Sequence, residues 1–198
     1  NWGSTATPGE NGNLYSAGVT NEGAGGKYPA TPGAFQTEYG GIYDVGILKY
    51  DSTGKELLYA SYLGGTNSES AHSLIMHANG DLIVLGTTSS ADFPVSTNAF
   101  DTGYNGGVPI GNVISYSFGS DLFVFRTNRD GTAILGSTFI GGAANDGLNP
   151  GGSPLVQNYG DELRGDVITD ADGNIYISSV TSSSNFPVEN GFDLVYNG

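Results

Sequence analysis

The apolar residues of this chain gather in short runs, and the same runs return in the same order. Three runs follow an Asn-Gly or Asp-Gly dipeptide and end at a threonine: "NGNLYSAGVT" (11–20), "NGDLIVLGTT" (79–88) and "DGNIYISSVT" (172–181). These dipeptides favour the tight turns of β-hairpins, and β-branched and aromatic residues favour strands. Each run therefore predicts a turn followed by a strand.

A longer unit occurs twice without a gap. "DVGILKYDSTGKELLYASYLGG" (44–65) returns as "DLFVFRTNRDGTAILGSTFIGG" (121–142), and the copies lie 121 − 44 = 77 positions apart. The pattern predicts a strand, a turn that contains glycine, and a second strand. We expect the double glycine to let the chain leave this strand for the next repeat, with Gly65 or Gly142 at positive φ.

The segment before each Asn-Gly or Asp-Gly turn shows a weaker strand pattern. Segments 71–78 and 163–171 are plausible strands, whereas residues 1–10 match this element poorly. The repeat therefore contains four strands. No stretch shows the 3.6-residue period of a helix, so the chain is predicted to be all-β.

Two of the predicted strands, "DLIVLG" and "DLFVFR", are apolar at consecutive positions, which indicates burial of both faces. A repeated four-stranded unit that is covered on both faces predicts a β-propeller of four-stranded antiparallel blades, with these two strands as neighbours. Blade 1 spans about 1–65, blade 2 about 66–142 with loop insertions, and a partial blade 3 about 143–198. Because a propeller closes with roughly 4–8 blades, we expect residues 1–198 to form part of one propeller domain. The remaining blades would come from the same chain or from a partner chain.

Three motifs resemble a known repeat. Phe93-Pro94 through Gly107, Asp121 to Gly142, and Asp170 to Tyr176 are similar, in that order, to the SBBP-type β-propeller repeat. The first repeat departs from the pattern, with "KYP" in place of "NFP". The resemblance implies a secreted or surface-anchored bacterial protein of the adhesin-like kind. In Bacteroidota such proteins often carry gliding-motility-associated or type IX secretion sorting domains. No such domain is recognised within residues 1–198.

Charge narrows the choice of partners. Lys and Arg number 6 against 20 Asp and Glu, a net charge of −14, so nucleic acid and anionic membrane would be repelled. The charge is explained by a solubilising surface, with affinity for calcium as the alternative. Cysteine is absent, which excludes disulfide and thiol chemistry. No apolar run approaches the roughly 18 residues of a membrane span, so membrane insertion is not expected.

The sequence holds no HExxH, GxSxG or P-loop motif. His72 and His77 are five positions apart, which suits opposite faces of a strand better than one metal site. "DADGN" (170–174) begins like a calcium loop, but the positions that need glycine and glutamate hold Ile175 and Thr181. A turn is the better interpretation, and no cofactor is expected apart from the calcium alternative.

Residues that recur in every copy are expected to serve the scaffold, because a catalytic site needs only one copy. Asp44 and Asp121 recur at the start of the same strand, which predicts acceptors that cap a turn. A phenylalanine and a tyrosine four positions later also recur, and we expect them to anchor loops: Phe35 and Tyr39, Phe100 and Tyr104, Phe192 and Tyr196. No catalytic role is therefore predicted.

The second repeat is longer than the first in two connections. From Pro94 to Asp121 is 27 positions against 15 from Pro29 to Asp44, and from Gly142 to Gly173 is 31 against 15 from Gly65 to Gly80. In an up-and-down sheet both connections emerge on one face. Insertions on one face often form a binding surface, with decorative loop growth as the alternative. The candidate binding residues are Tyr104, Tyr116, Phe118, Asp146, Tyr159 and Asp161.

These observations favour a non-enzymatic binding or adhesion module of a secreted bacterial cell-surface protein. It could be a type IX secretion cargo linked to gliding or adhesion, with a protein or glycan ligand at the face that carries the insertions. Two alternatives stay open: a propeller enzyme that acts on glycans, and a structural spacer in a surface filament.

Overall fold

The computed structural model describes residues 2–22, 27–111, 114–149, 162–163 and 165–197. Within these ranges the regular structure is almost entirely β. The one helical element described is a single 3₁₀ turn, η1 (Glu10–Gly12). The all-β prediction is thereby confirmed.

Three antiparallel sheets follow one another along the chain. Sheet 1 comprises β1 (Trp2–Pro8), β2 (Leu14–Thr20), β3 (Asp44–Tyr50) and β4 (Leu57–Leu63), in that order. Sheet 2 comprises β5 (Glu69–Met76), β6 (Leu82–Thr88), β9 (Asp121–Thr127) and β10 (Ile134–Ile140), also in chain order. Sheet 3 comprises β11 (Gly165–Thr169) and β12 (Ile175–Ser179). A short ribbon of β7 (Ile110–Gly111) and β8 (Ser115–Tyr116) lies within the β6–β9 connection.

The strand pairing follows the repeat, with one correction. "LIVLG" and "LFVFR" are antiparallel neighbours, as predicted, with Val84 opposite Phe125. Residues 1–10 were expected to match the first strand of the repeat poorly, yet residues 2–8 form β1 and pair with β2. A register shift between Trp2 and Ser4 accompanies this pairing. The first repeat therefore has its first strand, β1, although the sequence pattern of the repeat is not recognisable there.

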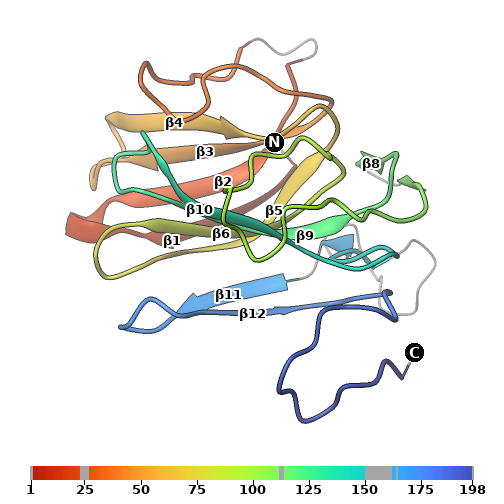
Figure 1. The fold of residues 1–198 in the computed structure, drawn as a ribbon. Coiled ribbons are helices and arrows are strands. Elements are labelled where there is room, and N and C mark those ends of the chain that lie inside the picture. Colours follow the sequence, from red (N-terminus) through yellow and green to blue (C-terminus); the bar gives the residue numbers. More distant parts are fainter. Residues whose placement is uncertain (1, 23–26, 112–113, 150–161, 164, 198) are drawn as a thin grey trace.

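The three sheets lie as successive layers, with sheet 2 between the other two (Figure 1). The first strand of each sheet lies innermost, because β5 contacts β1 on one side and β11 on the other. Each sheet thus turns the same edge toward its neighbours. The described sheets do not close into a ring, so the propeller stays a prediction.

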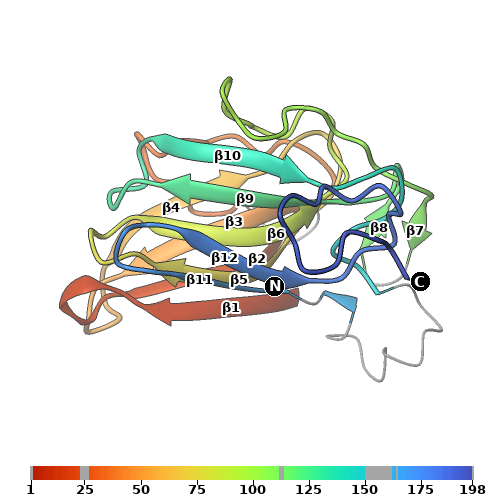
Figure 2. The ribbon, with the colours of Figure 1, turned by 60° about the horizontal axis from the view of Figure 1, so that its bottom comes forward.

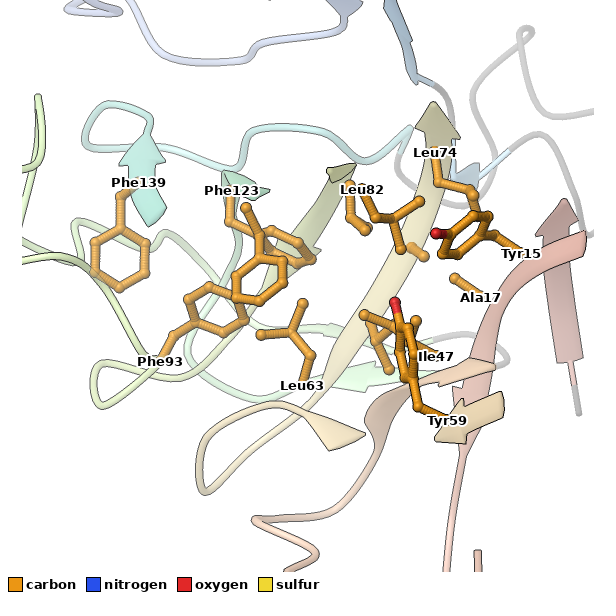
Figure 3. Packing of buried hydrophobic residues seen from close by; sticks show 14 residues of the cluster. Tyr15, Ala17, Ile47, Tyr59, Leu63, Leu74, Leu82, Phe93, Phe123 and Phe139 are labelled. Carbon is orange, nitrogen blue, oxygen red and sulfur yellow. The ribbon is translucent and has the colours of Figure 1, made fainter. Parts of the chain in front are cut away.

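Both faces of the two central strands of sheet 2, β6 and β9, are buried, which accounts for their unbroken apolar runs. Leu82, Val84 and Phe123 pack against sheet 1 in one cluster (Figure 3). Ile83 and Leu85, which alternate with Leu82 and Val84 along β6, belong to a second cluster that includes residues of sheet 3. A fully buried side chain of this size contributes roughly 1.5–3 kcal/mol of transfer free energy. Consecutive apolar positions in one strand therefore hold two interfaces together.

The double glycines are needed for space rather than for positive φ. Neither Gly65 nor Gly142 is among the glycines with positive φ, so that expectation was wrong. A Cβ on Gly142 would instead lie 2.6 Å from Asn185 Oδ1 and 2.6 Å from Ser183 Cβ. A Cβ on Gly65 would meet Asp92 Oδ1 at 2.5 Å. The chain crosses between sheets so closely packed that no side chain fits.

We predict that Gly142→Ala lowers the free energy of unfolding by about 1–3 kcal/mol, because the new methyl group overlaps its neighbours. Gly136→Ala in β10 is the matched control, since a Cβ there has no heavy atom within 4 Å. It should be neutral or slightly stabilising. Urea denaturation of both variants measures the difference, and equal stability of the two would contradict the packing argument.

Candidate binding site at the loop end

The molecule has two distinct ends (Figure 2). The tight turns β1–β2, β3–β4, β5–β6, β9–β10 and β11–β12 lie together at the end that we call the turn end. The connections β2–β3, β4–β5, β6–β9 and β10–β11 emerge at the other end, which we call the loop end, and all of them except β4–β5 are long. The alternation of strand direction dictates this segregation.

The two insertions of the second repeat meet at the loop end, as predicted. Asn145, in the β10–β11 connection, donates from Nδ2 to the carbonyl of Val108 at 3.0 Å and accepts from the amide of Ser120 at 3.0 Å. The amide of Asp146 donates to the carbonyl of Ser120 at 2.8 Å. Two connections that are far apart in the sequence therefore form one hydrogen-bonded surface.

Buried carboxylates hold the chain where it crosses from one sheet to the next. Glu69 accepts from the amide of Gly65 at 3.0 Å and from the hydroxyl of Thr88 at 2.6 Å. Asp146 repeats this arrangement by accepting from the amide of Gly142 at 2.8 Å and from the hydroxyl of Thr181. Both carboxylates are fully buried. Asp146, a candidate binding residue, thus satisfies main-chain groups and offers no surface to a ligand.

Asp44 and Asp121 cap the connections that lead into β3 and β9, as the sequence predicted. Asp44 accepts from the amide of Gly40 at 2.8 Å. Asp121 accepts from the amides of Asn105 at 2.7 Å and Gly106 at 3.0 Å. Each carboxylate satisfies buried donors that would otherwise lose their hydrogen bonds to water.

Burial raises the pKa of these carboxyl groups. Desolvation is the largest cause in each case, and it raises the pKa of Asp44 to about 6, of Asp121 to about 7 and of Glu69 to about 7. Nearby charges add to the effect: Asp44 raises the pKa of Glu69, and Asp146 raises that of Asp121. Hydrogen bonds from main-chain amides act in the opposite direction.

Tyr116 lies inside the fold, although it was predicted to face a ligand. Its side chain is 2% exposed, and its hydroxyl lies 2.6 Å from Ser70 Oγ. It belongs to a small apolar cluster with Val19 and Leu148, in which β2 and the two insertions come together. Tyr116 therefore fastens the β7–β8 ribbon to the inner strand of sheet 2.

An open hollow of about 630 Å³ lies beside this ribbon. Two candidate residues line it: Phe118, whose side chain is 60% exposed, and Tyr104. Tyr104 donates from its hydroxyl to the carbonyl of Gly119 at 2.9 Å, which fixes its ring at the wall. The remaining lining residues are Thr66, Asn67, Ser89, Ala91 and Asp92.

The walls of the hollow are tied together by hydrogen bonds. Asp92 accepts from the amide of Thr66 at 2.9 Å, and Ser89 Oγ accepts from the amide of Phe118 at 3.2 Å. Sequence reasoning missed Ser89 and Asp92. A signal existed, because "SSADFP" (89–94) returns as "SSSNFP" (182–187). Two of the predicted residues, Tyr159 and Asp161, lie outside the described residues.

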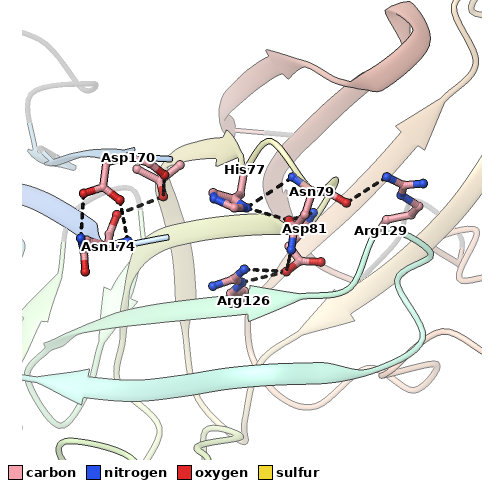
Figure 4. A network of polar contacts seen from close by, with 8 residues as sticks. His77, Asn79, Asp81, Arg126, Arg129, Asp170 and Asn174 are labelled. Atoms are coloured by element: carbon pink, nitrogen blue, oxygen red, sulfur yellow. Dashed lines mark hydrogen bonds and ion pairs between the residues drawn. The ribbon is translucent and has the colours of Figure 1, made fainter. Parts of the chain in front are cut away.

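The turn end carries a different polar network (Figure 4). Asp81 accepts from Arg126 Nη2 at 2.7 Å and from Asn79 Nδ2 at 2.9 Å. In the "DADGN" segment, Asp170 accepts from the amide and side chain of Asn174 at 2.9 and 2.8 Å, and these bonds lower its pKa. Asp170 thus closes a turn, as predicted. Among the described residues, no three His, Asp or Glu side chains gather into a group that could hold a metal ion.

The sequence matches no protein-family model, and no curated protein matches it. In the part of the chain that the structure describes, no helix is long and apolar enough to cross a membrane. Because these comparisons give no relative, the candidate site is interpreted from its own residues.

We predict that the free energy of unfolding falls as the pH rises from about 4.5 to 7.5. The raised pKa values mean that the folded protein binds more protons than the unfolded chain in this range, so stability is highest at low pH and is lost as Glu69 and Asp121 ionise. Each group can contribute at most about 1.4 kcal/mol per pH unit.

Asp121→Asn should make this pH dependence less steep, whatever it does to the stability itself. Asp51→Asn is the control, because Asp51 is only partly buried and its pKa is lowered by hydrogen bonds, chiefly from Thr53. Both variants replace one carboxyl group with an amide. Urea denaturation at several pH values and constant ionic strength measures the slopes, and identical slopes would contradict the assignment.

Proposed function

We propose that this chain is a non-catalytic binding module of a secreted, surface-exposed bacterial protein, and that it holds its ligand in the hollow at the loop end. The observation that carries the proposal is the exposed ring of Phe118 at the rim of a hydrogen-bonded hollow. The resemblance to SBBP-type propeller repeats supports the surface location and an adhesive role. It also supports a propeller built of blades like sheets 1 and 2.

The hollow is organised before any ligand arrives. Its walls come from two connections, 64–68 and 89–120, which bond to one another through Asp92 and through the carbonyl of Ser68. A site that is already ordered loses less conformational entropy on binding. An exposed phenylalanine on such a rigid rim can therefore contribute most of its apolar area to affinity.

The lining suits a ligand with both apolar and hydroxyl-bearing faces. Phe118 and Tyr104 offer ring surface, while Thr66 and Asn67 carry hydroxyl and amide groups at the same hollow. A sugar unit presents C–H groups on one side and hydroxyls at its edge, so a surface glycan fits this lining. A polar protein segment is the other ligand class that the lining accommodates.

Catalysis by the repeated carboxylates is disfavoured by their surroundings. Asp44, Glu69, Asp121 and Asp146 are buried and accept main-chain hydrogen bonds, so they are engaged in holding the fold. A glycosidase places two carboxyl groups on either side of an accessible bond. The described carboxylates that recur between the sheets do not have that access.

We predict that Phe118→Ala weakens binding to a polysaccharide ligand by about tenfold or more, without a large loss of stability, because the ring is exposed. Phe192→Ala is the matched control, since Phe192 is an exposed phenylalanine that does not line the hollow. Binding of the chain to a panel of bacterial surface polysaccharides would be measured for all three proteins, along with release of reducing sugar.

The outcomes separate the three hypotheses. Binding without turnover that depends on Phe118 and not on Phe192 supports the module. Hydrolysis of any polysaccharide would support the enzyme instead. Unchanged binding in the Phe118 variant would place the ligand elsewhere, and a chain that bound neither the polysaccharides nor a surface-protein fraction would support the spacer.

A further inference from the structure

Sheet 3 has two described strands where sheets 1 and 2 have four. Its second strand, β12, corresponds to β6, which lies between β5 and β9 and is buried along its whole length. In β12 only one edge is paired, with β11. Among the residues that the structure describes, no strand lies along the other edge of β12.

Each complete sheet contains a set of three aromatic rings in the same places. In sheet 1, Tyr28 and Tyr39 from the β2–β3 connection pack on Tyr62 of β4, with ring centroids 5.1 and 5.7 Å apart. The last strand thus supplies the ring that the connection packs against.

Sheet 2 repeats this arrangement. Phe93 and Tyr104 from the β6–β9 connection pack on Phe139 of β10, at 6.1 and 5.9 Å. The corresponding residues after β12 are Phe186 and Tyr196. Tyr196 is 44% exposed, and the two residues line a hollow of about 220 Å³ that also includes Thr181. The first two rings of a third set are therefore present beside an empty space.

A second aromatic contact is incomplete at the same place. Phe35, in the connection of sheet 1, packs on Phe125 of the third strand of sheet 2, with ring centroids 4.9 Å apart. Its amide donates to the carbonyl of Gly131 at 2.9 Å. Phe100 occupies the same position in the next repeat, yet it is 72% exposed. Its counterpart partner would belong to the third strand of sheet 3.

We propose that the open edge of β12, together with connection 186–197, is the seat of a β-hairpin of the β3–β4 kind that continues the polypeptide after this connection. The hairpin begins with an aspartate that accepts from the amide of Asn197, as Asp44 accepts from Gly40 and Asp121 from Asn105. Its second strand places an aromatic ring on Phe186 and Tyr196. Its first strand covers Phe100.

The register of the hairpin follows from sheets 1 and 2. Thr20 lies opposite Asp44, and Thr88 lies opposite Asp121. The corresponding threonine is Thr181, so the first aspartate of the hairpin lies opposite Thr181. A second copy of the chain does not supply this hairpin, because β3–β4 and β9–β10 are already paired within their own sheets.

The chain contains the probe for a test. A copy of residues 42–65 would be fused after Gly198, because "YNG" (196–198) then precedes it as "YGG" (39–41) precedes residue 42 in the chain. Amide hydrogen exchange of β12 and of β6 would be compared with and without the extension. We expect exchange in residues 175–177 of β12 to slow at least tenfold in the fusion. Exchange in β6, which is already paired on both edges, reports whether sheet 2 stays folded.

Two variants of the fusion test whether the added hairpin packs on the hollow beside β12. Tyr196→Ser should remove most of the added protection, since Tyr196 lines the hollow. Phe192→Ser in the same connection should retain it, because Phe192 is fully exposed outside the hollow. The proposal is overturned by a fusion whose β12 exchanges as fast as the unextended chain while β6 stays protected. It is also overturned by equal effects of the two variants, or by concentration-dependent protection of β12 in the unextended chain, which would assign the edge to a second copy.

Discussion

The fold depends on one constraint, which is that main-chain amides must find acceptors where the chain crosses between closely packed sheets. At each described crossing a buried carboxylate meets this need: Glu69 for Gly65 and Asp146 for Gly142. The glycines allow the approach, and the carboxylates satisfy the donors that the approach buries. Leaving such a donor unsatisfied costs about 1–3 kcal/mol. The raised pKa of Glu69 and the close contacts around Gly65 and Gly142 belong to this arrangement.

The two ends of the molecule differ in the kind of hydrogen bond that holds their connections. Tight turns at one end are closed by local carboxylates such as Asp51 and Asp170, whose bonds lie within the turn. Longer connections at the other end are tied to residues far along the chain, for example by Asn145 and Tyr116. Only the second kind of contact creates a surface built from several segments. The candidate site therefore lies where the fold already requires long-range hydrogen bonds.

Much of this could be predicted from the sequence, because repetition exposes what the scaffold needs. The strand order, the pairing of "LIVLG" with "LFVFR" and the capping role of Asp121 follow from the repeat and from elementary β-sheet rules. The site was harder to predict. Sequence pattern cannot separate a tyrosine that packs inward, such as Tyr116, from an exposed ring two positions later, Phe118. That difference depends on the direction in which the β7–β8 ribbon folds back onto β5, which no local rule determines. The conformation at Gly65 and Gly142 was missed for a related reason, since crowding by residues far along the chain decides it.

The clamping of the β6–β9 connection at its base has an implication for how such a surface can vary. Asn105 bonds to Asp121, and Gly107 bonds to the carbonyl of Phe118, so the segment between them leaves and re-enters the sheet at adjacent points. Sheet 1 achieves the same closure with Gly40 and Asp44 only four positions apart. The entropy of closing a loop rises only slowly with its length. The stability of the sheet should therefore depend only weakly on the number of residues between the two anchors. Connections of different length and sequence can present different surfaces there while the sheet keeps its geometry.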